Sequence, residues 1–310
     1  MDPFQDMQPF IVRANIMNFP FNEELDLRKS GFLLKPSRIP WYLKIKTDST
    51  GEIAFIILAP NWEFAVNLAQ EGILRFVSEL LTYATYQPVF FNNIRIEDKD
   101  HVFICEWNRL VGLPTQEPPR IRPERTLDFL NEGINKITKS GIYFGSPRLI
   151  ESLYWINQII ISPFVIDEFK FTMLWLALET LVTADEECSK ETVLLSRNDF
   201  KSLKTSVGDW AKTNRIKEET TRILMNRLNC VNRLPTSERI IFFCNAHNIK
   251  INESTIAAIN TARNVIQHVP WKTPRDLRSQ YLQLQLLIEN CICGVIGLNP
   301  EDYLVPDRMP

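Results

Sequence analysis

The first third of the chain alternates short apolar runs with one longer segment of helical periodicity. The stretches "WYLKIKTDSTGEIAFIIL" (41–58) and "VFFNNIRIEDKDHVFICEW" (89–107) each hold two strand-like runs around a polar turn, so both predict β-hairpins. Between them, "WEFAVNLAQEGILRFVSELLTYA" (62–84) repeats apolar residues at helical spacing. The pattern predicts an N-terminal region of mixed α and β structure.

From residue 124 onward the apolar positions recur with helical spacing only. The stretch "GLPTQEPPRIRPE" (112–124) separates the two parts, because its four prolines disfavour both helix and central strand. We therefore predict an α+β domain over 1–112, a proline-rich linker over 113–123 and an all-α helical bundle over 124–310. The helices are expected at 124–139, 147–161, 167–184, 198–229, 236–246, 252–269 and 276–296.

Composition and charge describe a globular chain without an overall preference for polyanions. Apolar residues make up 45% and charged residues 23%, and the net charge of −2 excludes a chain-wide grip on nucleic acid. Residues 197–239 differ, since ten basic side chains there face five acidic ones. A solvated helix surface is the simpler interpretation of this window, and a phosphate-binding surface is the alternative. Within it, Trp210 is expected in the core, although it is also suited to stacking on a base.

Neither a metal site nor a membrane segment is expected. The six cysteines are scattered through mostly apolar runs without a second ligand set nearby, which predicts buried thiols and no cofactor. The N-terminus lacks the features of a signal peptide, and Glu179, Glu289 and Asn290 interrupt the longest apolar runs. We therefore expect a cytoplasmic protein. Of the three histidines, His101 is expected at a strand edge without a partner, and His247 at the end of a helix.

The helix predicted over 252–269 combines an apolar stripe with an unusual polar arc. Advancing about 100° per residue places the apolar side chains on one face: Ala258, Ile259, Ala262, Val265, Ile266 and Val269. A contiguous arc opposite this stripe carries Asn260, Arg263, Asn264, Gln267 and His268. A solvated helix surface normally favours Glu and Lys. Amides, an arginine and a histidine without a carboxylate instead indicate a binding or catalytic surface.

The residues in this arc are the components of metal-independent RNA cleavage. Arg263 supplies a permanent cation with a fork of donors that suits a phosphate, and His268 supplies a side chain that transfers protons near neutral pH. Asn264 lies four residues before His268, so its amide is positioned to orient the ring. One histidine does not readily serve as base and acid at once. Two copies across a two-fold axis would supply both, which predicts a homodimer.

Glu179 is a further candidate because it is the only charged residue between Phe171 and Ala184. A carboxylate in such apolar surroundings needs a partner. It either braces Arg263 or His268 from a facing helix, or it forms a structural pair with another basic residue.

Two motifs resemble a known family. The stretch "ARNVIQH" (262–268) is similar to the R-N-x-x-x-H signature of the HEPN superfamily. The stretch "FKFTMLWLALETLV" (169–182) resembles the second-helix signature of the ApeA-like branch of that superfamily. The resemblance covers roughly 146–298. It implies an all-α, HEPN-like endoribonuclease domain that acts as a dimer in bacterial conflict systems, such as anti-phage abortive infection, or as a toxin. One departure is that Val269 and Pro270 follow the histidine, where many members have a small residue.

The resemblance also implies roles and partners. Catalysis would fall to Arg263, Asn264 and His268, with Glu179, Asn260 and Gln267 in support. The partners implied are an RNA substrate, a second copy and possible regulation by a protein or a phage-derived trigger, with no membrane. The alternative is a non-catalytic HEPN module that binds RNA, nucleotide or a partner protein. A metal-dependent nuclease is a weaker idea, because the chain offers no evident cluster of Asp, Glu and His to hold the ions.

Overall fold

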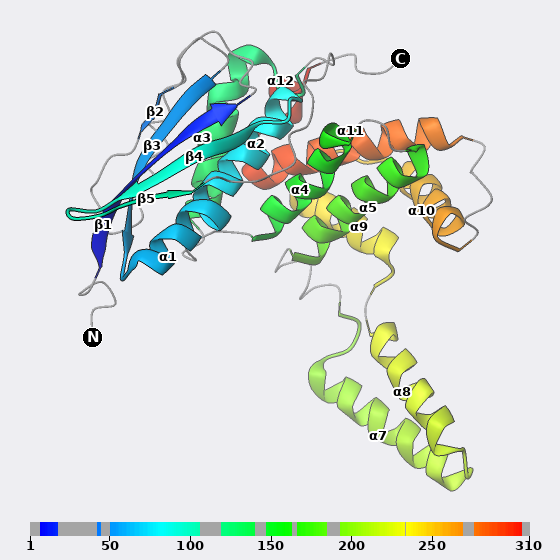
Figure 1. The fold of residues 1–310 in the computed structure, drawn as a ribbon. Coiled ribbons are helices and arrows are strands. Elements are labelled where there is room, and N and C mark those ends of the chain that lie inside the picture. Colours follow the sequence, from blue (N-terminus) through cyan, green and yellow to red (C-terminus); the bar gives the residue numbers. More distant parts are fainter. Residues whose placement is uncertain are drawn as a thin grey trace.

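The computed structural model describes residues 7–17, 42–44, 50–105, 119–139, 147–162, 166–184, 193–232, 234–268 and 276–305. Its N-terminal part is a five-stranded antiparallel sheet in the order β2-β3-β1-β4-β5 (Figure 1). The strands are β1 (Gln8–Met17), β2 (Tyr42–Lys44), β3 (Thr50–Ala59), β4 (Phe90–Glu97) and β5 (Val102–Cys105). The remainder of the described chain is helical. At this level the expected order, an α+β region followed by helices, is confirmed.

Both predicted hairpins form, but the central strand of the sheet was missed. β2 pairs with β3 and β4 pairs with β5. Of the turn predicted at 48–51, residues 48 and 49 lie outside the described residues, and Thr50 and Gly51 belong to β3. β1 lies between β3 and β4 and buries Phe10, Val12, Ala14 and Ile16 on one face. This alternation with period two is the signature of a strand that is covered on one side.

A nearly continuous helical segment packs on this sheet. It consists of α1 (Trp62–Asn67), a π-helical stretch (Leu68–Leu74) and α2 (Arg75–Thr85). The Asn61 side chain caps the first turn by accepting a hydrogen bond from the backbone N–H of Phe64. The Trp62 ring meets the Phe10 ring edge-on, with 5.0 Å between centroids, and so joins the helix to β1. The helix predicted over 62–84 is therefore confirmed.

The helices that follow agree with the predicted ranges to within about two residues, except over 198–229 and at the short α12, which was not predicted. They are α3 (Thr126–Lys139), α4 (Pro147–Ile161), α5 (Asp167–Ala184), α7 (Arg197–Thr213), α8 (Glu218–Val231), α9 (Thr236–Ala246), α10 (Glu253–His268), α11 (Leu277–Ile296) and α12 (Pro300–Tyr303). The single helix predicted over 198–229 is wrong. Arg215 has a φ of 51°, which turns the chain back, so that α7 and α8 form a hairpin that projects from the body (Figure 1).

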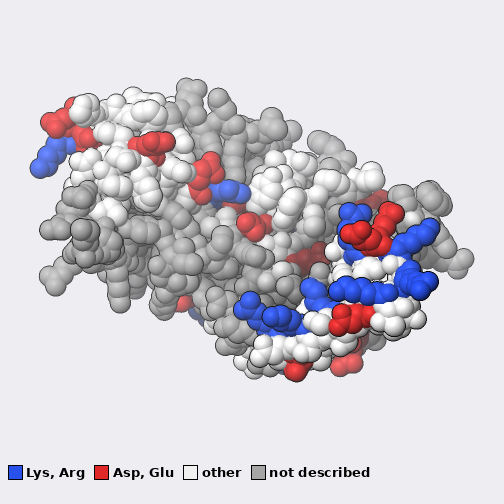
Figure 2. Space-filling model, turned by 90° about the horizontal axis from the view of Figure 1, so that it is seen from below, with Lys and Arg blue, Asp and Glu red and all other residues white. Residues whose placement is uncertain are grey.

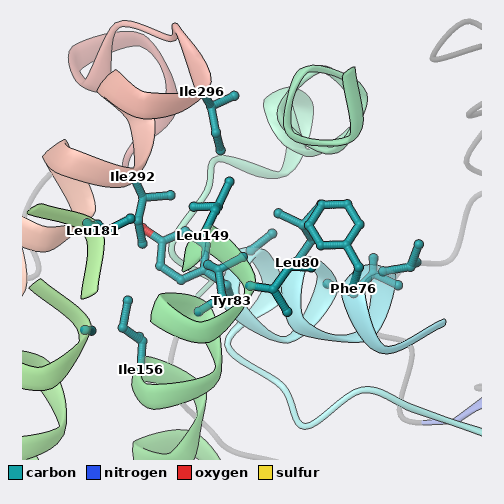
Figure 3. Packing of buried hydrophobic residues seen from close by; sticks show 14 of the residues in the cluster. Phe76, Leu80, Tyr83, Leu149, Ile156, Leu181, Ile292 and Ile296 are labelled. Atoms are coloured by element: carbon teal, nitrogen blue, oxygen red, sulfur yellow. The ribbon is translucent and has the colours of Figure 1, made fainter. Parts of the chain in front are cut away.

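The buried core runs without interruption from the sheet into the helical part. Figure 3 shows side chains from α2, α4, α5 and α11 meeting in one apolar cluster. The Asn157 amide of α4 donates hydrogen bonds to the backbone oxygen and the carboxylate of Glu79 on α2, each 2.8 Å long. α4 thus packs on α2, which buries Ile159 and places Arg75 5.7 Å above the Tyr154 ring.

The segment after the sheet enters this core. Residues 113–118 of the predicted linker lie outside the described residues, whereas Arg120 and Ile121 are buried. Ile121 forms a β-bridge with Leu304 near the C-terminus. The boundaries at 112 and 124 stay a prediction.

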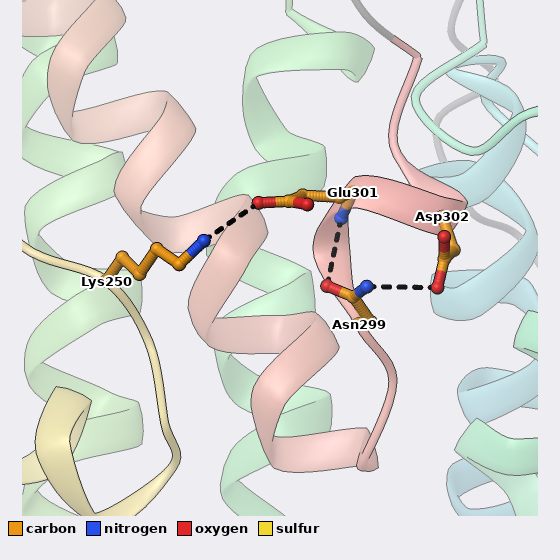
Figure 4. A network of polar contacts seen from close by, with 4 residues as sticks. All are labelled: Lys250, Asn299, Glu301 and Asp302. Carbon is orange, nitrogen blue, oxygen red and sulfur yellow. Dashed lines mark hydrogen bonds and ion pairs between the residues drawn. The ribbon is translucent and has the colours of Figure 1, made fainter.

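The C-terminal end is held by short polar contacts around α12. Asn299 accepts a hydrogen bond from the backbone N–H of Glu301 and donates one to Asp302, and Lys250 lies 3.2 Å from the Glu301 carboxylate (Figure 4). The Arg122 side chain donates to the backbone oxygens of Leu304 and Glu301. Within the described ranges, no helix is both long enough and apolar enough to cross a membrane.

Candidate functional site

The helix that carries the predicted motif, α10, has one buried face and one polar face. Ile259 and Ala262 are buried as the periodicity predicts, and Ile256 joins them. Ala258, Val265 and Ile266 are half-buried, while Val269 lies outside the described residues. On the polar side Asn260 and Arg263 are half-buried, and the exposed residues are Asn264, Gln267 and His268. The predicted arc is therefore open to solvent over its C-terminal half.

Arg263 is held by side chains from the facing helix α5. Its Nη2 lies 3.9 Å from Glu179 Oε1, and its guanidinium carbon lies 5.5 Å from the centre of the Trp175 ring. Trp175 and Glu179 are four residues apart, so one face of α5 presents both to the arginine. The interpretation of Glu179 as the partner of Arg263 is confirmed. The stacking on Trp175 was not predicted, although the Trp-x-x-x-Glu spacing carries the signal for it.

Asn264 completes the group that holds the arginine. The Arg263 Nη1 donates a 3.0 Å hydrogen bond to Asn264 Oδ1. This bond engages the amide oxygen that we expected to orient His268, and no hydrogen bond joins Asn264 to His268 among the described residues. The amide thus positions the cation and not the imidazole.

The environment of Arg263 is apolar on one side and open on the other. The arginine side chain is 27% exposed and that of Glu179 is 29% exposed. On the inner side, Arg263 Nε and Trp175 Nε1 are buried without a hydrogen-bond partner in the described part of the chain. A cation that is stacked, paired and hydrogen-bonded has little conformational freedom left to lose when an anion binds.

His268 is the last residue of α10 and is exposed. It stands apart from the group around Arg263, five residues further along the helix, with no hydrogen bond or ion pair to the rest of the described chain. Asn260 and Gln267 lie on the same side of the helix without a hydrogen bond to Arg263 or His268 in the described ranges. The structure therefore offers a fixed cation and, beyond it, an imidazole that is free to turn.

The other two histidines lie elsewhere. His101 is exposed at the edge of the sheet, but the expectation that it lacks a partner is wrong, since its Nδ1 lies 3.4 Å from Asp98 Oδ1. A hydrogen bond from the backbone N–H of Asp100 lowers the pKa of Asp98. His247 follows the end of α9, as predicted, with its ring 4.5 Å from that of Phe243.

Buried thiols make poor candidates for chemistry. Cys244, Cys291 and Cys293 are free and buried, as expected. The hydrogen bond with Cys244 and burial raise the pKa of Cys291, and burial raises the pKa of Cys293 to about 12. The thiols of Cys291 and Cys293 are therefore protonated at neutral pH, and a protonated thiol is a weak nucleophile. The side chains of the described residues form no group of three or more His, Cys, Asp or Glu that suits a metal ion.

Comparison of the chain with protein-family models, curated proteins and solved structures found no match. The resemblance to the HEPN superfamily over 146–298 therefore depends on its two motifs.

The basic window identified in the sequence coincides largely with the projecting α7–α8 hairpin. The expectation that Trp210 lies in the core is wrong, because its side chain is 54% exposed. The reason is that α7 packs on α8 and not on the body of the molecule, so that among the described side chains of the two helices only Ala211 is buried.

Proposed function

We propose that this chain is a metal-independent, HEPN-type endoribonuclease that acts in the cytoplasm as a homodimer. One observation carries the proposal: on one helix, a guanidinium is immobilised by Glu179, Trp175 and Asn264, while the imidazole of His268 stays accessible. The first arrangement suits electrostatic stabilisation of a phosphate, and the second suits proton transfer.

The reaction needs only groups of these types. The ribose 2′-oxygen attacks the adjacent phosphorus, and a base removes the 2′-hydroxyl proton. The bond from phosphorus to the 5′-oxygen breaks, and an acid protonates that oxygen. The products are a 2′,3′-cyclic phosphate and a 5′-hydroxyl. Arg263 stabilises the negative charge on the pentacoordinate phosphorus, and His268 carries a proton in one of the two transfers.

A second copy of the chain supplies the other proton-transfer group. The polar face of α10 is exposed at Asn264, Gln267 and His268, which leaves room for a symmetry-related helix to approach. A two-fold axis near this face would bring two imidazoles and two guanidinium groups to one strand of RNA. The N-terminal α+β region then senses a trigger, such as a phage-derived component or a regulatory protein, and acts through the shared core on the helices. An effector of anti-phage defence or a toxin has this organisation.

The test is incubation of the purified chain with RNA in the presence of EDTA. We expect fragments that end in 2′,3′-cyclic phosphate, and a loss of activity by about 10²–10⁴-fold in His268→Ala, the usual contribution of a general acid or base. His101→Ala is the matched control, because it removes an exposed histidine of the sheet edge. If the RNA stays intact but binds to the chain, the alternative function, a non-catalytic RNA-binding module, is correct and the nuclease function is refuted. If EDTA abolishes cleavage, the metal-independent mechanism is refuted.

The dimer is tested separately by mixing the parent chain with an inactive variant. Parent and His268→Ala chains, unfolded together in equal amounts and refolded, form mixed dimers whose shared cleft holds one imidazole instead of two. Since about a quarter of the dimers then keep both imidazoles, activity should fall to about a quarter of that of an equal amount of parent dimer. Activity of about half, as expected when each chain acts alone, contradicts a shared cleft.

A further inference from the structure

The α7–α8 hairpin carries a groove with cationic walls. The groove has a volume of about 740 Å³ and lies between the two helices. Its cationic side chains all come from α7: Arg197, Lys201, Lys204 and Lys212. The first three follow one another at spacings of four and three residues, so they lie in one row along the helix. Figure 2, drawn from the side toward which the hairpin points, shows lysine and arginine gathered in one area of this face.

The floor of this groove is apolar. Phe200 and Met225 line it, and Gly208 lets the two helices approach closely, since a Cβ at this glycine would lie 3.1 Å from the Met225 methyl carbon. The Lys204 Nζ lies 5.5 Å from the centre of the Phe200 ring, which keeps this cation over the groove. One carboxylate, that of Asp209, also lines the groove and lies 3.8 Å from the Lys212 Nζ. The lining therefore carries four cationic side chains against one carboxylate.

Both ends of α7 carry residues that favour a helix. Ser196 caps the helix, Asp199 is the acidic residue of the first turn and Lys212 is the basic residue of the last turn. Helix stability therefore accounts for Asp199 and Lys212, whereas Arg197, also in the first turn, lies at the positive end of the helix dipole. An anion bound at this end would interact favourably with Arg197 and with the dipole together.

We propose that the groove of the α7–α8 hairpin binds the sugar–phosphate backbone of single-stranded RNA and holds the substrate at a distance from α10. The choice of RNA among polyanions depends on the proposed function. The cationic walls neutralise phosphates, and the apolar floor accepts a ribose or a base edge. The row from Arg197 to Lys204 extends along about 10 Å of α7, and Lys212 extends the cationic lining to about 22 Å, long enough for several nucleotides.

The shape of the site favours a narrow polymer over a flat surface. A bilayer would meet the exposed apolar residues Leu203 and Trp210, which lie seven residues apart on a different face of α7. The cations, in contrast, line a concavity. An acidic protein would also be attracted to the charge, so the experiment includes both rivals as outcomes.

The first test measures RNA binding without cleavage. The full chain carrying His268→Ala is titrated against a fluorescent 20-nucleotide RNA, and anisotropy is recorded over a series of salt concentrations. Each phosphate contact contributes about 0.7 to the slope of log affinity against log salt for a single strand. Lys201→Gln/Lys204→Gln should therefore lower the slope by about 1.4 and weaken binding about tenfold at about 150 mM salt.

The matched control removes the same charge elsewhere. Arg95→Gln/Lys250→Gln changes two exposed cations outside the hairpin and should leave affinity and slope near those of the parent. Equal losses in both double variants would mean that only net charge matters, which overturns the groove. Unchanged binding in the groove variant overturns it as well. Binding to anionic vesicles or polyglutamate with an affinity equal to that for RNA overturns the assignment to RNA.

The second test separates this site from the cleavage site. In chains with an intact His268, the groove variant should raise KM for a long RNA about tenfold and leave cleavage of a dinucleotide unchanged, since so short a substrate cannot span both places. If RNA is cleaved and the groove variant has no effect, the RNA-binding role of the groove is refuted and the proposed nuclease function stands. If RNA binding depends on the groove but no cleavage occurs, the nuclease function is refuted and the RNA-binding role of the groove stands.

Discussion

Replacement of Glu289 by glutamine should destabilise the whole molecule, because Glu289 neutralises a buried arginine. Arg120 is 1% exposed and lies 3.5 Å, Nη1 to Oε1, from Glu289 on α11. The Tyr83 and Tyr86 rings of the α2 end flank its guanidinium at 5.1 and 4.7 Å. Burial by itself lowers the pKa of Arg120, but the Glu289 carboxylate and the tyrosines outweigh it and the net shift is upward. The guanidinium of arginine is not deprotonated in proteins, so Arg120 stays charged when Glu289 is neutralised.

The expected loss follows from this geometry. At a separation of 3.5 Å, Coulomb's law with an effective dielectric constant of about 20 gives about 5 kcal/mol for two unit charges. Removal of one partner of a buried pair typically costs about 3–5 kcal/mol. None of the three guanidinium nitrogens of Arg120 has a hydrogen-bond partner among the described residues, so little remains to compensate the positive charge once the Glu289 carboxylate is neutralised. A loss of about 4 kcal/mol is a large part of the 5–15 kcal/mol that stabilises a typical domain.

The assay is urea unfolding followed by far-UV circular dichroism and tryptophan fluorescence. Because the core is continuous from the sheet to α11, both signals should shift together in Glu289→Gln. Glu301→Gln, which neutralises the exposed partner of Lys250, is the control and should change stability by less than about 1 kcal/mol. The double variant Arg120→Met/Glu289→Met should recover most of the loss, since it removes both charges. A change below about 1 kcal/mol in Glu289→Gln, or a double variant as unstable as the sum of the two single ones, refutes this account.

Two further predictions test the site and a helix end. Glu179→Gln removes the carboxylate that holds Arg263, so kcat for RNA cleavage should fall about 10–100-fold, the scale expected when a reacting group is misplaced, while KM and the circular dichroism spectrum stay nearly unchanged. The control Asp167→Asn, at the opposite end of α5, should retain activity. Equal rates in the two variants would contradict the role of Glu179. Gly297→Ala should lower the free energy of unfolding by about 1 kcal/mol, because Gly297 ends α11 at a φ of 90°, which strains the backbone of alanine. A Cβ at this position meets no atom within 4 Å, so no steric clash adds to the strain. An unchanged midpoint of urea unfolding would show that the end of α11 relaxes without cost.

Most of the helical part could be predicted from the sequence because its breaks use residues that stop helices locally. Proline precedes α9, and helical periodicity marks α5, α10 and α11 within one residue of their ends. The prediction failed at 198–229, where Asn214 and Arg215 turn the chain without a proline or glycine. The exposure of Trp210 follows from that error, since a residue in a continuous buried helix and a residue in a projecting hairpin have different surroundings.

The sheet was harder to predict because its pairing is not local. The two hairpins are visible in the sequence, whereas β1 pairs with β3 and β4 across long intervals of chain. Its buried residues Phe10, Val12, Ala14 and Ile16 alternate with the less buried Ile11, Arg13 and Asn15, of which Ile11 is apolar, so the polarity pattern of this strand is weak. The packing of this face under α1 and α2 depends on tertiary contacts that periodicity alone does not specify.

The candidate site also has a part that the sequence predicts and a part that depends on tertiary contacts. A lone carboxylate in an apolar helix was enough to predict that Glu179 has a partner, but it left Arg263, His268 and other basic residues open. The structure pairs it with Arg263, at 3.9 Å. The role of Asn264 was not predictable from spacing, since residues one and four positions away are both within reach of a short amide. The structure decides for Arg263, at 3.0 Å.

An ion pair that served the fold alone would account for Glu179 and Trp175 but not for the rest of the α10 surface. Asn264, Gln267 and His268 continue the polar face beyond the paired arginine, and all three are exposed. Their exposure adds no packing energy, and asparagine and histidine are weaker helix formers than the lysine and glutamate that ordinary surfaces use. A catalytic surface explains both halves, since a cation has to be placed accurately against a phosphate, while a proton donor has to remain able to turn.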